Sequence, residues 1–145
     1  MLRDKLKLFL VVIGLFIGSL PAHSQDIKGS WQNELGSIFV IDSISSDGFI
    51  FGKYKSSSGV DGRIFPLQGW VNNLDNANKN EKHSIAVAFT VRWDGYGSIT
   101  SWSGYYDEDQ NGPFIKTLWH LVRPNEKEAW ERIITNSSTF RPFQE

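Results

Sequence analysis

Short segments rich in β-branched and aromatic residues recur along most of the chain, separated by clusters of Gly, Asn, Asp and Ser. Beyond the first 24 residues, the apolar positions do not repeat with the period of a helix. The segments have the length and composition of strands. The pattern therefore predicts about eight strands, over residues 27–33, 37–43, 48–56, 63–71, 84–93, 98–107, 114–123 and 132–142.

The connections between these strands favour antiparallel neighbours, since residues 45–47, 94–97 and 109–112 are short enough to close hairpins. Strands linked in order predict an all-β fold, an eight-stranded antiparallel up-and-down β-barrel, because closing the sheet removes its exposed edges. A β-sandwich is the alternative. Pro66 lies inside the fourth strand and cannot donate to a ladder, so a bulge or an unpaired position is expected there.

Two connections are longer or less regular. Residues 72–83 are polar and rich in Asn, as expected for a long solvated loop. Further along, Asn125 with Glu128 three residues later resembles a capping box. This pair predicts a single helical turn that carries Trp130 outside any strand.

Tryptophans and hydroxyls share faces of the predicted strands. Successive side chains of a strand point to opposite faces, so Ser98, Thr100 and Trp102 lie together. The same rule groups Trp119 with Leu121. A dry core avoids hydroxyls, because a buried hydroxyl without a partner costs roughly 1–3 kcal/mol, whereas aromatic walls with convergent polar groups are typical of a small-molecule pocket. If these faces point inward, the barrel mouth holds Asn33, Ser37, Tyr54, Ser56, Ser98, Thr100 and Ser138 among Trp93, Trp102 and Trp119.

The opposite, outward faces carry small and apolar residues. The seventh predicted strand presents Leu118, His120 and Val122 outward, and the fifth presents Ala86 and Ala88. Apolar residues on an outer face predict contact with another subunit. His120 is accordingly expected at an interface rather than in a site.

The first 24 residues have the features of a secretory signal peptide. Three basic residues among the first seven precede an almost wholly apolar run over residues 8–20, and small side chains suited to cleavage follow. The apolar run is shorter than the roughly 18 residues that a membrane anchor needs. We therefore expect a signal peptide over residues 1–24, a mature barrel domain over residues 25–145, a secreted or periplasmic location and no membrane association after cleavage.

Charge and composition narrow the function. Residues 1–24 hold three of the 15 basic and one of the 16 acidic residues, so their removal changes the net charge from −1 to −3. A weakly acidic chain is not expected to bind nucleic acid, which calls for a basic face. The chain has no cysteine, which excludes thiolate metal sites and thiol catalysis.

The titratable residues do not suggest catalysis. An enzyme needs such groups aimed into its pocket, whereas His83 falls in or beside the long loop and most acidic residues near the strands fall at turns. We therefore predict a binding protein with no catalytic residues and no metal site. A lipocalin-like carrier of another small apolar ligand is the alternative, although it would favour an interior without clustered donors.

Several segments resemble the avidin and streptavidin family, in the same order along nearly all of the mature chain. They are GSWQNELGS at 29–37, GKYKS at 52–56, VRW at 91–93, SITSWSG at 98–104 and TLW at 117–119. The family fold is an eight-stranded up-and-down barrel that holds a ligand. The resemblance implies non-catalytic, high-affinity binding of biotin, with no cofactor.

By position, the resemblance also implies a role for each polar residue. Asn33, Ser37 and Tyr54 would donate hydrogen bonds to the ureido oxygen of biotin, and Ser56 would accept one from a ureido N–H. Thr100 would face the thioether sulfur. The valerate carboxylate would meet Ser98 and the loop 57–59, which includes Ser58 and Gly59. The walls around the bicyclic ring and the chain would be Trp93, Trp102, Trp119 and Leu121.

Two further positions bear on affinity and assembly. Trp130 matches an indole that, in the family, covers the site of a neighbouring subunit, which implies a homotetramer, with a homodimer as the alternative. Ser138 falls where the family has an Asp or Asn that accepts a hydrogen bond from the second ureido N–H. A hydroxyl is shorter and uncharged, so a lost or water-bridged contact there would cost roughly 1–3 kcal/mol of binding free energy.

Overall fold

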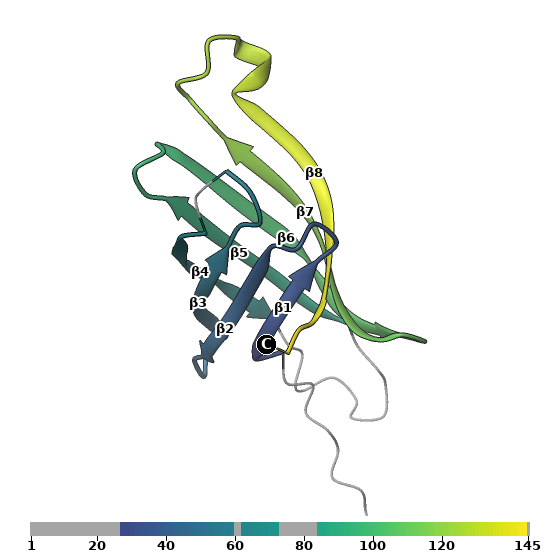
Figure 1. The fold of residues 1–145 in the computed structure, drawn as a ribbon. Helices are drawn as coiled ribbons and strands as arrows, with labels where there is room; N and C mark the ends of the chain where they lie inside the picture. The colour runs from purple at the N-terminus through teal and green to yellow at the C-terminus, as the bar shows by residue number, and fades with distance from the viewer. Residues whose placement is uncertain (1–26, 60–61, 73–83, 145) are drawn as a thin grey trace, which may run out of the picture.

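Eight antiparallel strands close into one barrel in the computed structural model, which describes residues 27–59, 62–72 and 84–144 (Figure 1). Each strand pairs with the next along the chain, and β1 pairs with β8 to close the sheet. The predicted up-and-down barrel is therefore confirmed, and the β-sandwich is excluded. The strands are β1 (Gly29–Asn33), β2 (Ile38–Ile44), β3 (Phe49–Lys55), β4 (Ile64–Asn72), β5 (Ile85–Trp93), β6 (Ser98–Asp109), β7 (Gly112–Val122) and β8 (Ile133–Pro142).

The strand ends lie within two residues of those expected from the sequence. The start of β1 is shifted by two residues, and so are both ends of the β6–β7 hairpin, where Asp109 still pairs with Gly112 and both strands extend beyond their predicted ends. The proposed signal peptide and the loop that includes His83 lie outside the described residues.

The expected unpaired position at Pro66 is confirmed on the side that faces β5, and no bulge is present. The β3–β4 ladder continues through Pro66, which lies opposite Lys53, without a bulge. On its other side, the β4–β5 ladder begins only at the next residue, Leu67. The missing N–H of proline is thus accommodated where β4 has not yet met β5. An irregularity of register lies elsewhere, in β2 between Ile41 and Ser43.

The predicted helical turn is present, but the predicted capping box is wrong. A 3-10 turn, η1, covers Ala129–Glu131, and its N-cap is Glu128, with no hydrogen bond from a capping side chain. Asn125 therefore lies too far upstream to cap it. Arginine side chains from the two flanking strand ends hold this segment instead, since Arg123 Nη2 donates to the carbonyl of Glu131 and Arg132 Nε donates to that of Glu126.

Aromatic side chains fill the interior of the barrel at one end. Phe39 is fully buried, with its ring centroid 4.9 Å from that of Phe89 and 4.7 Å from that of Phe140. Trp31 packs edge-on against Tyr106 at 6.0 Å. Strand alternation thus places the large apolar residues in a plug across β1, β2, β5, β6 and β8.

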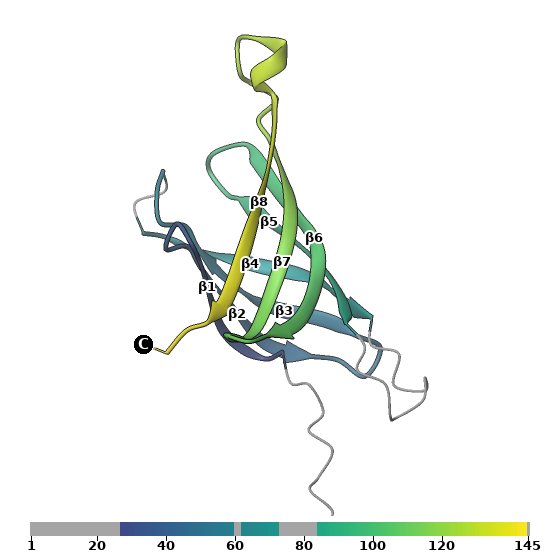
Figure 2. The ribbon, with the colours of Figure 1, turned by 90° about the vertical axis from the view of Figure 1, so that its right-hand side faces the viewer.

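At the other end, β7 and β8 extend past the remaining strands and carry η1 away from the barrel (Figures 1 and 2). Outward-facing side chains near this extension are exposed, among them Leu118 and Ile133. Trp130 is 77% exposed at its tip. Among the described residues, no helix is long and apolar enough to cross a membrane.

Several inward-facing glycines, Gly104 and Gly69 among them, lie where the backbone of a paired strand leaves no room for a side chain. A Cβ atom on Gly104 of β6 would overlap the carbonyl oxygen of Lys116 in β7, and one on Gly69 of β4 would overlap the carbonyl oxygen of Ala88 in β5. Backbone atoms of a paired strand cannot rotate away as a side chain can. Both positions therefore require glycine for the barrel to keep its curvature.

We expect Gly104→Ala to lower the free energy of unfolding by about 1–3 kcal/mol, because the added methyl group must push β7 away from β6. Urea denaturation followed by tryptophan fluorescence measures this change. Ser103→Ala is the matched control, since Ser103 is the adjacent, exposed residue of the same strand. Equal unfolding midpoints for the two variants would mean that the strands separate freely at this point.

Candidate functional site

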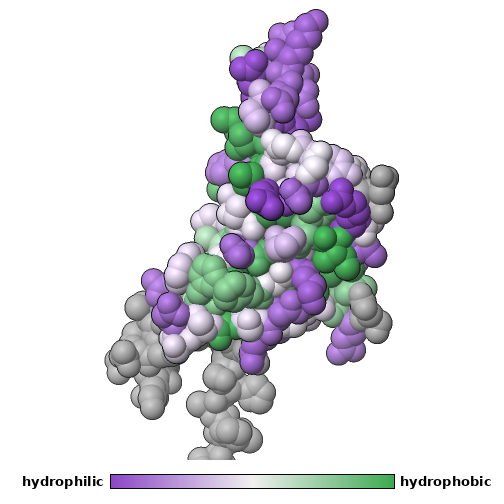
Figure 3. All heavy atoms as spheres, turned by 90° about the vertical axis from the view of Figure 1, so that its left-hand side faces the viewer, coloured by the Kyte–Doolittle hydropathy of each residue, from purple (hydrophilic) through white to green (hydrophobic). Residues whose placement is uncertain are grey.

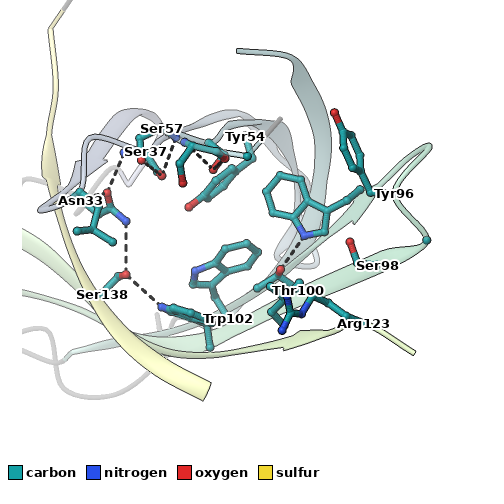
Figure 4. A pocket seen from close by; sticks show the side chains of 18 of the residues that line it. Asn33, Ser37, Tyr54, Ser57, Tyr96, Ser98, Thr100, Trp102, Arg123 and Ser138 are labelled. Atoms are coloured by element: carbon teal, nitrogen blue, oxygen red, sulfur yellow. Dashed lines mark hydrogen bonds between the residues drawn. The ribbon is translucent and has the colours of Figure 1, made fainter. Parts of the chain in front are cut away.

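The open end of the barrel holds a cavity of about 630 Å³. It lies beyond the aromatic plug, where β1, β3, β5 and β7 end and β2 and β6 begin. Figure 4 shows side chains that line it. All the residues that the sequence places in one chain's binding site line this cavity, namely Asn33, Ser37, Tyr54, Ser56, Ser58, Gly59, Trp93, Ser98, Thr100, Trp102, Trp119, Leu121 and Ser138. Trp130 is not among the residues that line it.

Aromatic rings form the walls of the cavity. The ring of Tyr54 lies 4.8 Å from that of Trp102 and meets that of Trp93 at a right angle, 5.6 Å away. Trp102 also stacks on Phe89 of the plug at 5.0 Å. These contacts hold the rings in place from behind, so the walls are rigid.

Asn33, the last residue of β1, is held in one orientation by the turn that follows it. Its Oδ1 accepts hydrogen bonds from the backbone N–H groups of Leu35 at 3.1 Å and Ser37 at 2.9 Å. Because the amide oxygen is occupied, its NH2 group faces the interior, where it lies 3.4 Å from Ser138 Oγ. Asn33 is 8% exposed and therefore presents a buried donor to the cavity.

Ser138 of β8 lies beside Asn33 on the cavity wall and is 4% exposed. Its Oγ is 3.2 Å from Trp119 Nε1, which donates to it. Its backbone carbonyl accepts a hydrogen bond from Thr117 Oγ1. Ser138 thus joins β1, β7 and β8 around one side of the cavity.

Tyr54 and Ser37 bring two further hydroxyls to the same region. Burial raises the pKa of the Tyr54 phenol to about 12, against the opposing effect of its hydrogen bond with Ser37. The phenol therefore keeps its proton throughout the physiological range. Ser37 Oγ also accepts a hydrogen bond from the N–H of Ser57 at 3.1 Å, which ties the β3–β4 loop to the cavity rim.

Ser56 and Thr100 are each partly engaged within the protein. Ser56 Oγ donates to the carbonyl of Ser58 at 2.8 Å. Thr100 Oγ1 accepts a short hydrogen bond, 2.7 Å, from Trp93 Nε1. Each hydroxyl oxygen keeps further hydrogen-bonding capacity, and both side chains line the cavity.

Several residues that line the cavity were not predicted from the sequence, Tyr96 and Arg123 among them. Tyr96, in the β5–β6 turn, lines the cavity, with the guanidinium of Arg63 5.6 Å from its ring centroid. Arg123 also lines it and lies 3.1 Å from Glu126 Oε1. The alternation of side chains along a strand could have predicted Arg123, because this residue shares the inward face of Trp119 and Leu121. No residue pattern predicts that Tyr96 lines the cavity, since the geometry of the turn determines where its side chain points.

Together these groups favour a small, flat ligand with a strong hydrogen-bond acceptor at one end. Donors from β1, from the turn before β2 and from β3 converge at one end of the cavity, and indole and phenol rings enclose the space around them. A rigid, largely desolvated set of donors of this kind stabilises negative charge on a carbonyl oxygen.

Three comparisons place the chain among known proteins. Residues 21–143 match the family model described as the Avidin family. Avidin of Gallus gallus is 30% identical over 120 residues, which cover 80% of this chain and 76% of that protein. The crystal structure of Xenavidin has a TM-score of 0.69 and 30% sequence identity, and the match covers 82% of this chain and 98% of that one.

A ligand-bound structure is also similar. The crystal structure of a shwanavidin variant in complex with biotin has a TM-score of 0.62 and 27% sequence identity, with 81% of this chain and 97% of that chain covered. The family model spans most of the sequence, and the barrel and the cavity-lining segments lie within the matched residues. The chain therefore belongs to the avidin family.

Proposed function

We propose that this protein is a non-catalytic, high-affinity binder of biotin, which enters the barrel mouth with its ureido ring foremost. The observation that carries this proposal is the convergence of Asn33, Ser37 and Tyr54 on one end of a cavity walled by tryptophans. Three donors suit the ureido oxygen, which is the strongest acceptor of the bicyclic ring system of biotin. The biotin complex of the similar shwanavidin variant supports the choice of ligand.

The remaining contacts follow from the same pose. Ser56 accepts a hydrogen bond from one ureido N–H, and Thr100 faces the thioether sulfur. Indoles of Trp93, Trp102 and Trp119 enclose the bicyclic ring, and Leu121 covers the aliphatic chain. At the mouth, the carboxylate meets the donors of Ser98, Ser58 and Gly59.

Binding rather than turnover fits the side chains of the cavity. Its inner part holds amide, hydroxyl and indole groups, and the ionisable Arg123 and Glu126 that line it lie at the mouth and pair with each other. Neutral donors in fixed positions bind a urea without activating it, so we assign no cofactor, metal or catalytic residue. Export through a signal peptide over residues 1–24 completes the proposal, with the mature domain over residues 25–145 acting outside the cytoplasm.

Titration of the refolded mature chain with biotin tests the proposal. We expect a saturable change in tryptophan fluorescence at or below micromolar biotin, because the ligand covers three indoles. Pentanoic acid, which has the chain and the carboxylate but no ureido ring, is the matched control and should give no such change. A flat response to biotin, together with no retention on a biotin column, would overturn the assignment.

The raised pKa of Tyr54 predicts how binding responds to pH. With a pKa of about 12, the phenol stays a donor at pH 10, where an ordinary tyrosine would be half ionised. We therefore expect the Kd for biotin to be the same at pH 8 and pH 10. Tyr54→Phe should raise the Kd about fivefold at both values, the equivalent of about 1 kcal/mol for one hydrogen bond.

Tyr105→Phe is the control for this substitution, because Tyr105 is an exposed tyrosine of β6. It should leave the Kd unchanged. Isothermal titration at the two pH values measures all three proteins. A loss of affinity at pH 10 in the wild type but not in Tyr54→Phe would contradict the raised pKa of the phenol, and equal Kd values for these two proteins at pH 8 would contradict its role as a donor.

We further propose that the chain assembles as a homotetramer in which Trp130 covers the cavity of a neighbouring subunit. Trp130 is 77% exposed on an extension whose other residues are mostly hydrophilic (Figure 3). An indole displayed in this way costs solvation free energy unless a partner buries it. The exposed Leu118 and Ile133 on the adjoining strands offer a surface for that partner.

Trp130→Lys should therefore weaken both the assembly and biotin binding. Light scattering on a gel-filtration column measures the oligomeric state. The rate of biotin dissociation measures the effect on binding, and we expect this rate to rise. Ala129→Lys places the same charge on the neighbouring residue of the turn and should have the smaller effect on both. A wild-type protein that is monomeric at every concentration would exclude this role for Trp130.

A further inference from the structure

The hydroxyl of Ser138 is surrounded by groups that can only donate hydrogen bonds. Trp119 Nε1 lies 3.2 Å from Ser138 Oγ, and Asn33 Nδ2 lies 3.4 Å from it (Figure 4). An indole N–H has no lone pair with which to accept, and neither has an amide nitrogen. Both contacts therefore end on the lone pairs of the Ser138 oxygen.

The Asn33 amide cannot turn over to relieve this arrangement. Its oxygen is held by two backbone donors, the N–H groups of Leu35 and Ser37. The reversed amide would set its NH2 group against both of them and leave three donors without an acceptor. The donor character of the group that faces Ser138 is thus fixed by the β1–β2 turn.

Because both lone pairs of the Ser138 hydroxyl accept hydrogen bonds, this group can make a further hydrogen bond only as a donor. A serine hydroxyl has one proton and two acceptor positions. Among the described residues, none accepts a hydrogen bond from this O–H. Because Ser138 lines the cavity and is 4% exposed, the proton is available to whatever occupies the cavity.

The other flank of the cavity has the opposite character. Ser56 commits its proton to the carbonyl of Ser58 at 2.8 Å and accepts a longer contact, 3.4 Å, from the N–H of Ser58. One lone pair of Ser56 remains for the ligand. One flank therefore accepts a hydrogen bond, and the Ser138 flank donates one.

We propose that Ser138 acts as a donor toward the ligand, and that the cavity favours rings with one N–H on the Ser56 side and an acceptor on the Ser138 side. This proposal rests on the biotin-binding function proposed above and refines it. A cyclic carbamate, in which a ring oxygen replaces one N–H of the urea, has this pattern. In biotin itself, the second ureido N–H faces the Ser138 O–H, and two donors oppose each other.

Two biotin analogues isolate this effect. Both are cyclic carbamates with the biotin side chain; in one the ring oxygen replaces the N–H on the Ser138 side, and in the other it replaces the N–H on the Ser56 side. The two share the same carbonyl group, so its weaker acceptor strength cancels in the ratio of their Kd values. The chain and carboxylate, held toward Ser98, fix which side each oxygen faces.

We expect the analogue with its oxygen toward Ser138 to bind about five- to 150-fold more tightly than its isomer, because the isomer opposes two donors at Ser138 and loses its bond to Ser56. Competition against biotin, followed by tryptophan fluorescence, gives both Kd values. A ratio of one or below would overturn the proposal.

Substitutions at Ser138 provide a second, independent test of the proposal. Ser138→Ala removes the donor, so the preference for the Ser138-side carbamate should shrink. If Ser138 instead accepted a ureido N–H, the same substitution would enlarge that preference. Ser138→Asp supplies enough acceptor positions for Asn33, Trp119 and the ligand, so it should invert the ratio and slow the release of biotin.

Ser137→Ala and Ser137→Asp are the matched controls, since Ser137 is the exposed neighbour of Ser138 on the opposite face of β8. Both should leave the ratio unchanged. A protein that does not bind biotin at all would overturn the proposed function and, with it, the role of Ser138. A protein that binds biotin but prefers the Ser56-side carbamate would overturn the role of Ser138 alone.

Discussion

The pairing of β1 with β8 is the constraint on which the rest of the molecule depends. It closes the sheet, and closure leaves each strand residue only two directions, into the barrel or out of it. The short β1 meets β8 only through the residues at its carboxyl end, Trp31 to Asn33, and Asn33 lies opposite Phe140. That register brings the amide of Asn33 next to Ser138. Closing the sheet and assembling the polar side of the cavity are therefore one event.

The two ends of the barrel have different roles, and this difference follows from the same geometry. The inward residues near one end are large and mostly apolar, and the polar atoms of Trp31 and Tyr106 among them are hydrogen-bonded within the protein. Toward the other end, the inward positions switch to hydroxyls, an amide and indoles, which hold one another through side-chain hydrogen bonds. Burial of the plug supplies stability, since apolar surface removed from water is the main favourable contribution to folding. The polar end is thereby free to keep unfilled hydrogen-bonding capacity for a ligand.

Much of this arrangement could be predicted from the sequence, because strands repeat with a period of two. Parity alone groups Trp93, Thr100 and Trp102 on the inside, and the order of the strands favours closure. The features that could not be predicted are those that do not follow the two-residue alternation of a strand. Tyr96 lies in a turn whose glycines set its direction, and η1 begins at Ala129 for reasons that involve arginine contacts from both neighbouring strands. The donor character of Ser138 also depends on which side of the Asn33 amide faces it, and only three-dimensional contacts decide that.

The turn that follows β1 has a chemical consequence beyond its role as a connection. Its backbone N–H groups at Leu35 and Ser37 set the polarity of the Asn33 amide, so the number of residues in the turn determines whether the cavity meets an NH2 group or a carbonyl oxygen. Inserting a single residue there would leave the type of every side chain that lines the cavity unchanged, including Leu35 and Ser37 of the turn itself. It would nevertheless release the amide to rotate and exchange a donor for an acceptor. Loop length, which is usually regarded as neutral in a barrel, is here a determinant of ligand selectivity.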